Sequence, residues 1–103
     1  MFRKQSAGYR LIFEALKTAG ADFLKIARQT RDLDEMIGEV ERHENFAQSV
    51  LARVDAGEMD EKYSQIPGAL EKLFRQVTHA TILSACLRLF ITYERSRRNI
   101  YGA

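Results

Sequence analysis

The sequence predicts an all-α fold of three long helices in an antiparallel up-down-up bundle. Apolar residues recur at intervals of three and four along most of the chain, which is the spacing of one face of a helix. The chain has one proline, Pro67, and no run in which apolar and polar residues alternate as in a half-buried strand. Its 103 residues fit one domain, which we assign to residues 1–103.

The first helix is expected over about residues 6–30. Gly20 leaves two interpretations open: it ends the helix ahead of a new N-cap at Asp22, or it forms a flat patch with Ala15 and Ala19 that another helix approaches closely. The continuous apolar stripe favours an unbroken helix. That stripe consists of Tyr9, Ile12, Phe13, Leu16, Ala19, Gly20, Phe23 and Ala27.

The second helix is expected to begin near Asp32 and to end at Gly57. Asp32 is a suitable N-cap with Glu35 three residues later, and glycine commonly follows the last turn of a helix. Residues 58–66 are polar and acidic, and we interpret them as the connection, in the form of a loop or one helical turn. The buried face is predicted to contain Leu33, Met36, Ile37, Val40, Ala47, Val50, Leu51 and Val54.

The third helix is expected to carry Pro67 in its first turn and to continue to about Arg98. At this length it spans roughly 48 Å, so its end should project beyond the other two helices. From Ala80 onward its apolar residues cover most of the circumference, and such a helix needs partners on two sides. We therefore expect a homodimer or larger assembly. The predicted interface comprises Leu83, Leu87, Phe90, Ile91 and Tyr93.

The acidic residues are concentrated in one segment. Residues 32–61 hold ten carboxylates and two basic residues, a net charge of −8, so with +2 overall the remainder carries +10. In a bundle, the acidic second helix is expected to have basic helices on both sides, which favours one helix order more than it adds stability.

A metal site inside the bundle is one functional hypothesis. Glu44 falls on the apolar seam of the second helix, His43 lies beside it, and His79 comes from the third helix. Carboxylates and imidazoles on facing helices hold metals in helical bundles. The favoured interpretation is different: Glu44 bonds to Arg75, to a lysine of the first helix, or to solvent.

Nucleic-acid binding is a second hypothesis. Arg95, Arg97 and Arg98 would contact phosphates, and Tyr93 or Tyr101 would stack on bases. We favour the interpretation that these arginines complement the negative end of the helix dipole. A pI of 8.8 is also low for a dedicated nucleic-acid-binding domain.

Several classes of protein are disfavoured by the sequence. The single Cys86 excludes an intramolecular disulfide and suits a reducing compartment, so we expect a cytoplasmic location. Neither a membrane span nor a signal peptide is expected. The sequence contains no glycine-rich phosphate loop, no paired-cysteine zinc spacing and no recognisable catalytic triad, so we expect neither an enzyme nor a cofactor.

The favoured function is therefore a small non-enzymatic interaction or regulatory module that acts as a homo-oligomer. A different protein is the other partner considered for such a module. Nucleic-acid binding and metal binding remain the two alternatives.

Overall fold

The computed structural model describes residues 2–57, 65, 66 and 68–100, with side chains described for residues 9–57, 65, 66 and 68–99. Three helices account for nearly all of this: α1 (Phe2–Gln29), α2 (Leu33–Asp55) and α4 (Ala69–Ile100). The described residues contain no strand. The prediction of an all-α chain with three long helices is therefore confirmed.

The α1–α2 boundary follows from local hydrogen bonds. The N–H of Thr30 donates to the carbonyl of Ile26, which closes the last turn of α1. The Asp32 side chain then accepts a hydrogen bond from the Asp34 N–H at 2.9 Å, as an N-cap does. Gly20 lies inside α1, so of its two interpretations the continuous helix is confirmed.

The other boundaries involve glycines with positive φ. Gly57 has a φ of +76° directly after the C-cap Ala56, and its N–H donates to the carbonyl of Val54. Gly68 also has a φ of +76°, and its carbonyl accepts from the Lys72 N–H in the first turn of α4. Pro67, predicted in that turn, lies outside the described residues, and α4 begins at Ala69.

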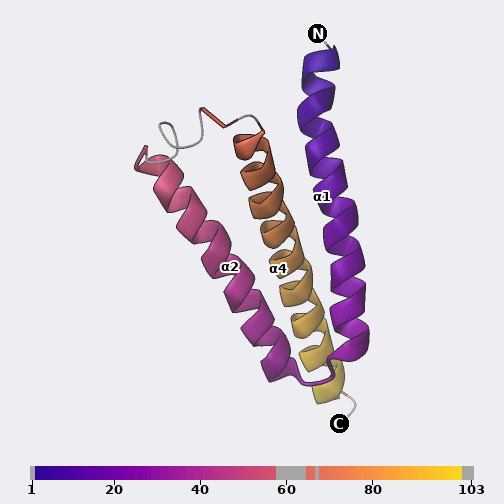
Figure 1. The fold of residues 1–103 in the computed structure, drawn as a ribbon. Coiled ribbons are helices and arrows are strands. Elements are labelled where there is room, and N and C mark those ends of the chain that lie inside the picture. Colours follow the sequence, from indigo (N-terminus) through magenta and orange to yellow (C-terminus); the bar gives the residue numbers. More distant parts are fainter. Residues whose placement is uncertain (1, 58–64, 67, 101–103) are drawn as a thin grey trace.

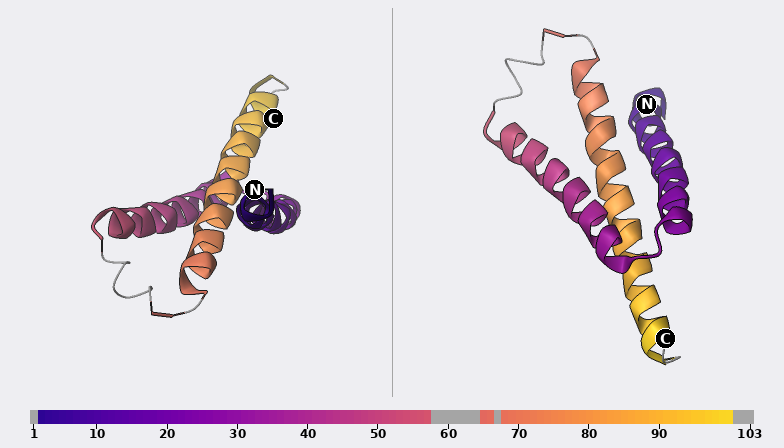
Figure 2. Two further views of the ribbon diagram at one scale, coloured as in Figure 1. Left: turned by 90° about the horizontal axis from the view of Figure 1, so that it is seen from above. Right: turned by 60° about the horizontal axis from the view of Figure 1, so that its bottom comes forward.

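The helix α4 occupies the centre of the molecule. Figure 1 shows α1 and α2 on either side of it, with α2 antiparallel to both other helices. The view from above in Figure 2 also places α1 and α2 on opposite sides of α4, and the inter-helix packing is between α4 and each of these two. The C-terminal end of α4 projects past the α1–α2 turn, as its length predicted.

The apolar core lies toward the end of the molecule that carries the α1–α2 turn. Its fully buried residues come from all three helices, and the Phe23 and Phe90 rings meet edge to face at 5.7 Å. At the other end α2 diverges from α4 (Figure 1). The radius of gyration is 16.7 Å, against about 13 Å for a compact domain of this size. The buried core residues are Ala19, Met36, Val40, Leu83, Leu87 and Ile91.

Candidate functional site

An open groove runs between the helices on one side of α4. It has a volume of about 420 Å³ and is lined by small, aromatic and basic side chains from all three helices. Both histidines of the chain lie in it, one from α2 and one from α4. The lining residues are Ala15, Thr18, His43, Phe46, Arg75, Gln76, His79 and Ala80.

His79 connects α4 to α1. Its Nε2 lies 2.7 Å from the Oδ2 of Asp22, and its side chain is 24% exposed. Because an ionised carboxylate only accepts hydrogen bonds, this contact favours the tautomer with the proton on Nε2 and leaves Nδ1 as an acceptor. Asp22 was not among the sequence-predicted site residues.

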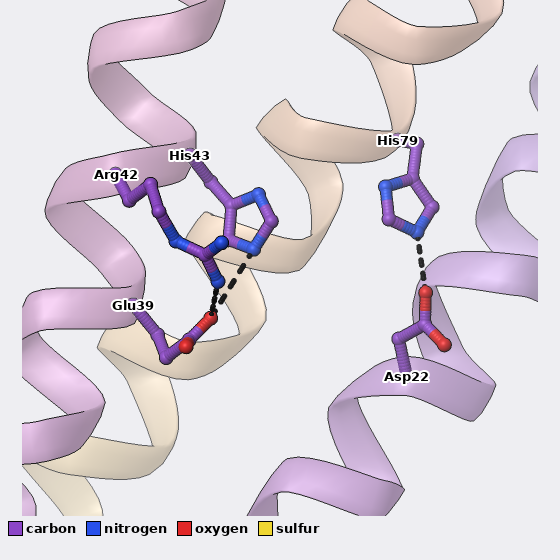
Figure 3. Close-up of polar contacts among 5 residues, drawn as sticks. All are labelled: Asp22, Glu39, Arg42, His43 and His79. Atoms are coloured by element: carbon purple, nitrogen blue, oxygen red, sulfur yellow. Dashed lines mark hydrogen bonds and ion pairs between the residues drawn. The ribbon is translucent and has the colours of Figure 1, made fainter.

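His43 has a similar arrangement within α2. Its Nε2 lies 3.5 Å from the Oε2 of Glu39, which also pairs with Arg42 (Figure 3). Burial lowers the pKa of the His43 imidazole, and the Arg42 guanidinium lowers it further, while the Glu39 carboxylate opposes both effects. The neutral imidazole is therefore favoured at this position.

The two histidines face one another. Their ring centroids are 6.4 Å apart and the ring planes meet at 72°. Figure 3 shows one nitrogen of each ring at a carboxylate; the other nitrogen of His79 is turned toward His43, whereas the other nitrogen of His43 lies at the upper edge of its ring in this view. The structure thus brings together two members of the predicted metal set.

Glu44, the third member of that set, is placed elsewhere. Its carboxylate accepts two hydrogen bonds from Arg88 of α4, at 2.5 and 2.7 Å. This hydrogen bonding lowers the pKa of Glu44. The expected partners Arg75 and a lysine of α1 are therefore wrong. The metal hypothesis required Glu44 to converge with the histidines, and it does not, because consecutive helical residues point about 100° apart.

The remaining polar side chains give no larger ligand cluster. Within the described part of the chain, no three His, Cys, Asp or Glu side chains are grouped so that they could hold a metal ion. Arg75, at the edge of the groove, pairs with Glu14 of α1 at 3.3 Å.

The ion pairs between helices correct the expected role of the charge partition. Asp22 and Glu14 of α1 contact His79 and Arg75 of α4, and Glu44 of α2 contacts Arg88 of α4. The acidic helix therefore does not lie between two basic helices as predicted. Instead, α4 lies in the middle and supplies the basic side of each contact.

The predicted nucleic-acid residues lie on the last turns of α4. Glu94 pairs with Arg97 at 2.8 Å and lies 3.6 Å from Arg98, and the hydrogen bond from Arg97 lowers the pKa of Glu94. Arg95 is exposed on the same helix. Tyr101 lies outside the described residues.

The backbone of Arg31 also lies in this region, a contact that sequence reasoning missed. The Arg98 guanidinium donates to the Arg31 carbonyl at 3.3 Å, because the end of α4 passes the α1–α2 turn. The predicted parallel direction of the first and third helices was the signal that could have located it.

The predicted oligomer interface is largely used within one chain. Leu83, Leu87 and Ile91 are buried in the core, and Phe90 packs against Phe23. The reason is that α1 and α2 both cover α4, which accounts for the apolar residues around its circumference. Tyr93 alone of the five predicted interface residues is exposed.

An exposed apolar stripe lies instead on α1. We call it the α1 stripe and define it by Tyr9, Ile12, Phe13, Leu16 and Leu24, which are 41–65% exposed. The sequence pattern placed the first four on the buried face. The structure turns α1 so that Ala15 and Ala19 are buried, as expected of residues that face a neighbouring helix.

Comparisons with known proteins return no relative. No protein-family model matches the chain, and searches of curated proteins and of solved structures give no match. In the part of the chain that the structure describes, no helix is long and apolar enough to cross a membrane.

Proposed function

We propose that this protein is a non-enzymatic helical interaction module that assembles with a second copy of itself through the α1 stripe. The observation that carries the proposal is the exposure of large side chains along one face of α1: Tyr9 is 60% exposed and Phe13 is 65% exposed. Single exposed apolar residues are ordinary, but a row of them along one helix is typical of an interaction surface.

Gly20 supports contact with another helix at this surface. It lies between Leu16 and Leu24 at four-residue spacing, so all three share one face of α1. A Cβ placed on Gly20 would meet nothing within 4 Å in the single chain. Since glycine in a helix interior costs about 1 kcal/mol relative to alanine, its presence here fits close packing against a second helix.

A second copy is favoured as partner because an α1–α1 contact is self-complementary. Two antiparallel copies of the stripe meet across a two-fold axis, the commonest symmetry of soluble homo-oligomers. This replaces Leu83, Leu87, Phe90 and Ile91 as the proposed interface.

Sedimentation velocity over a range of concentrations tests the proposal. Wild-type protein should sediment above the monomer mass of 11.8 kDa. Phe13→Glu and Leu16→Glu should sediment as monomers with unchanged helical circular dichroism, because both side chains are exposed within one chain. Leu89→Glu is the matched control: Leu89 is 73% exposed on α4, away from the stripe, so this variant should associate like wild type.

Two results would overturn the proposal. One is a wild-type protein that remains monomeric at high concentration. The other is association that survives Phe13→Glu and Leu16→Glu, or that is lost equally in Leu89→Glu.

Nucleic-acid binding remains the alternative function. The pairing of Arg97 and Arg98 with Glu94 weakens its support, because an anion would compete with a carboxylate already in place. The alternative predicts salt-dependent binding of a single strand that falls when Arg95, Arg97 and Arg98 are replaced by alanine. Absence of binding at low salt eliminates it.

A further inference from the structure

The two histidines of this chain form a convergent pair that the interaction function does not use. They are 36 positions apart in the sequence and come from α2 and α4, yet their rings lie 6.4 Å apart. Both side chains are partly buried, at 21% and 24% exposed, beside the open groove. The groove gives a solute access to the space between them.

We infer that His43 and His79 form a binding site for a divalent cation of the Zn²⁺ class, held by the Nδ1 atom of each ring. Imidazole is a preferred ligand of Zn²⁺, Cu²⁺ and Ni²⁺, whereas Mg²⁺ and Ca²⁺ prefer oxygen. The site is distinct from the metal set expected from the sequence, because Glu44 is replaced as a neighbour by Asp22 and Glu39.

The ring separation is close to what such a site requires. Zn²⁺–nitrogen bonds of about 2.0–2.1 Å in tetrahedral geometry place the centroids of two bound imidazoles about 5 Å apart. The observed 6.4 Å therefore requires the rings to approach by about 1 Å. The proposal therefore requires side-chain rotation of this size that keeps His79 Nε2 at Asp22.

The two carboxylates support this role. A metal-bound imidazole usually donates its other N–H to a carboxylate, which fixes the tautomer and raises the basicity of the ligating nitrogen. His79 has this partner in Asp22, 2.7 Å from Nε2, and His43 has Glu39 at 3.5 Å. Each carboxylate lies on the side of the ring away from the proposed ligand atom (Figure 3).

Arg42 opposes positive charge at His43, and Glu39 offsets part of this effect. Arg42 and Arg75 are the basic residues beside the pair, and each is matched by a carboxylate, Glu39 and Glu14 respectively. Since the described residues offer no third protein ligand here, water or a small anion completes the coordination from the groove. Such an open site binds an exchangeable ion, unlike the closed four-ligand sites that are structural.

Calorimetric titration of the purified, metal-free full chain with Zn²⁺ tests the inference. One Zn²⁺ should bind per chain, and thermal unfolding should shift to higher temperature, because the ion binds the folded state. His43→Gln and His79→Gln should each weaken Zn²⁺ binding at least about tenfold. Mg²⁺ should give neither heat nor thermal shift.

Two further variants distinguish Zn²⁺ binding at the histidine pair from binding at other carboxylates of the chain. Glu44→Gln should bind Zn²⁺ like wild type, because Glu44 faces Arg88. Asp22→Asn should weaken binding by about 10–100-fold without abolishing it, as expected for loss of an orienting partner. Circular dichroism of each variant confirms that it is folded.

The inference is overturned if Zn²⁺ produces no heat and no thermal shift with wild-type protein. It is also overturned if folded His43→Gln and His79→Gln bind Zn²⁺ as well as wild type does. Sedimentation of Phe13→Glu is independent of these results, so failure of the metal site and failure of the α1 interface are distinguishable.

Discussion

His43 and Glu44 are neighbours in sequence but belong to different contacts. His43 faces the groove and His79, whereas Glu44 turns to the other side of α4 and binds Arg88 with both carboxylate oxygens. Because the Glu44–Arg88 pair is exposed, it specifies how α2 and α4 align more than it stabilises them. Burial of the His43 imidazole, by contrast, makes the stability of the fold depend on pH.

Acidification is expected to destabilise the protein through His43. Its pKa lies below the ordinary value of 6.5, chiefly because of burial, so the unfolded chain binds a proton more readily than the folded chain. The contribution of His43 to stability is therefore fully present above pH 6.5 and is lost as the pH falls from there through the folded-state pKa. Glu39 moderates the effect, while Arg42 and His79 reinforce it.

Denaturant unfolding of wild type and His43→Gln above and below pH 6.5 measures this contribution. The free energy of unfolding should fall less on acidification in His43→Gln than in wild type. Identical pH dependence in the two proteins would show that burial of this imidazole has no energetic consequence.

At the scale of the elements, α4 was expected to present an exposed apolar face and α1 to bury its apolar stripe. The structure shows the reverse. The apolar circumference of α4 follows from its central position, since α1 and α2 each cover one side (Figure 1). By contrast, α1 packs mainly against α4, buries Ala15, Ala19 and part of Phe23, and leaves the side chains of the α1 stripe exposed. The face that the proposed self-association would cover therefore lies on α1.

Gly20→Ala is expected to stabilise α1. Gly20 lies in the helix interior with open space around its Cβ position, so alanine should raise the free energy of unfolding by about 0.5–1 kcal/mol. Urea unfolding in the Phe13→Glu background isolates this effect from association. In otherwise wild-type protein, the same substitution should weaken self-association if a second helix packs closely at this position.

Gly57→Ala is the matched control. A Cβ at Gly57 also meets nothing within 4 Å, but its φ of +76° is unfavourable for alanine. This variant should lose about 1 kcal/mol of stability. Effects of the same sign at the two glycines would contradict the interpretation of Gly20 as an ordinary helical position.

At the scale of the whole molecule, the core lies toward one end and the helices diverge at the other. The long dimension is 56 Å, while the buried cluster is formed by residues near the α1–α2 turn and the second half of α4. A chain of this size with so open a shape depends heavily on that one cluster.

Two leucines of α4 test whether stability depends on this one buried cluster. Leu87 is fully buried and Leu89 is 73% exposed, although only one residue separates them. Leu87→Ala should lower the free energy of unfolding by about 2–5 kcal/mol, because it leaves a cavity in the core. Leu89→Ala should change it by no more than about 0.5 kcal/mol.

Urea or guanidinium unfolding followed by circular dichroism compares the two leucine variants. Similar losses in both would show that α4 is not the centre of the core. A large loss at Leu89 alone would indicate that its exposed face is covered in solution.

Much of the secondary structure could be predicted because its determinants are local. Asp32 caps α2 through its own side chain, and Gly57 ends the helix through its own backbone conformation. The partner of Glu44 could not be predicted, because Arg75 and Arg88 both lie on α4 and only the register of α2 along it selects Arg88. Asp22 was missed as the partner of His79 for the same reason.

The sequence by itself determined the three helices, their approximate limits and their apolar faces, because periodicity and capping act within a few residues. The tertiary structure decided which helix is central, because a periodic pattern shows that a face is apolar but not which neighbour covers it. By placing α4 between α1 and α2, the fold buried the face first assigned to a partner. The same packing exposed the α1 stripe and brought together the two histidines of the chain.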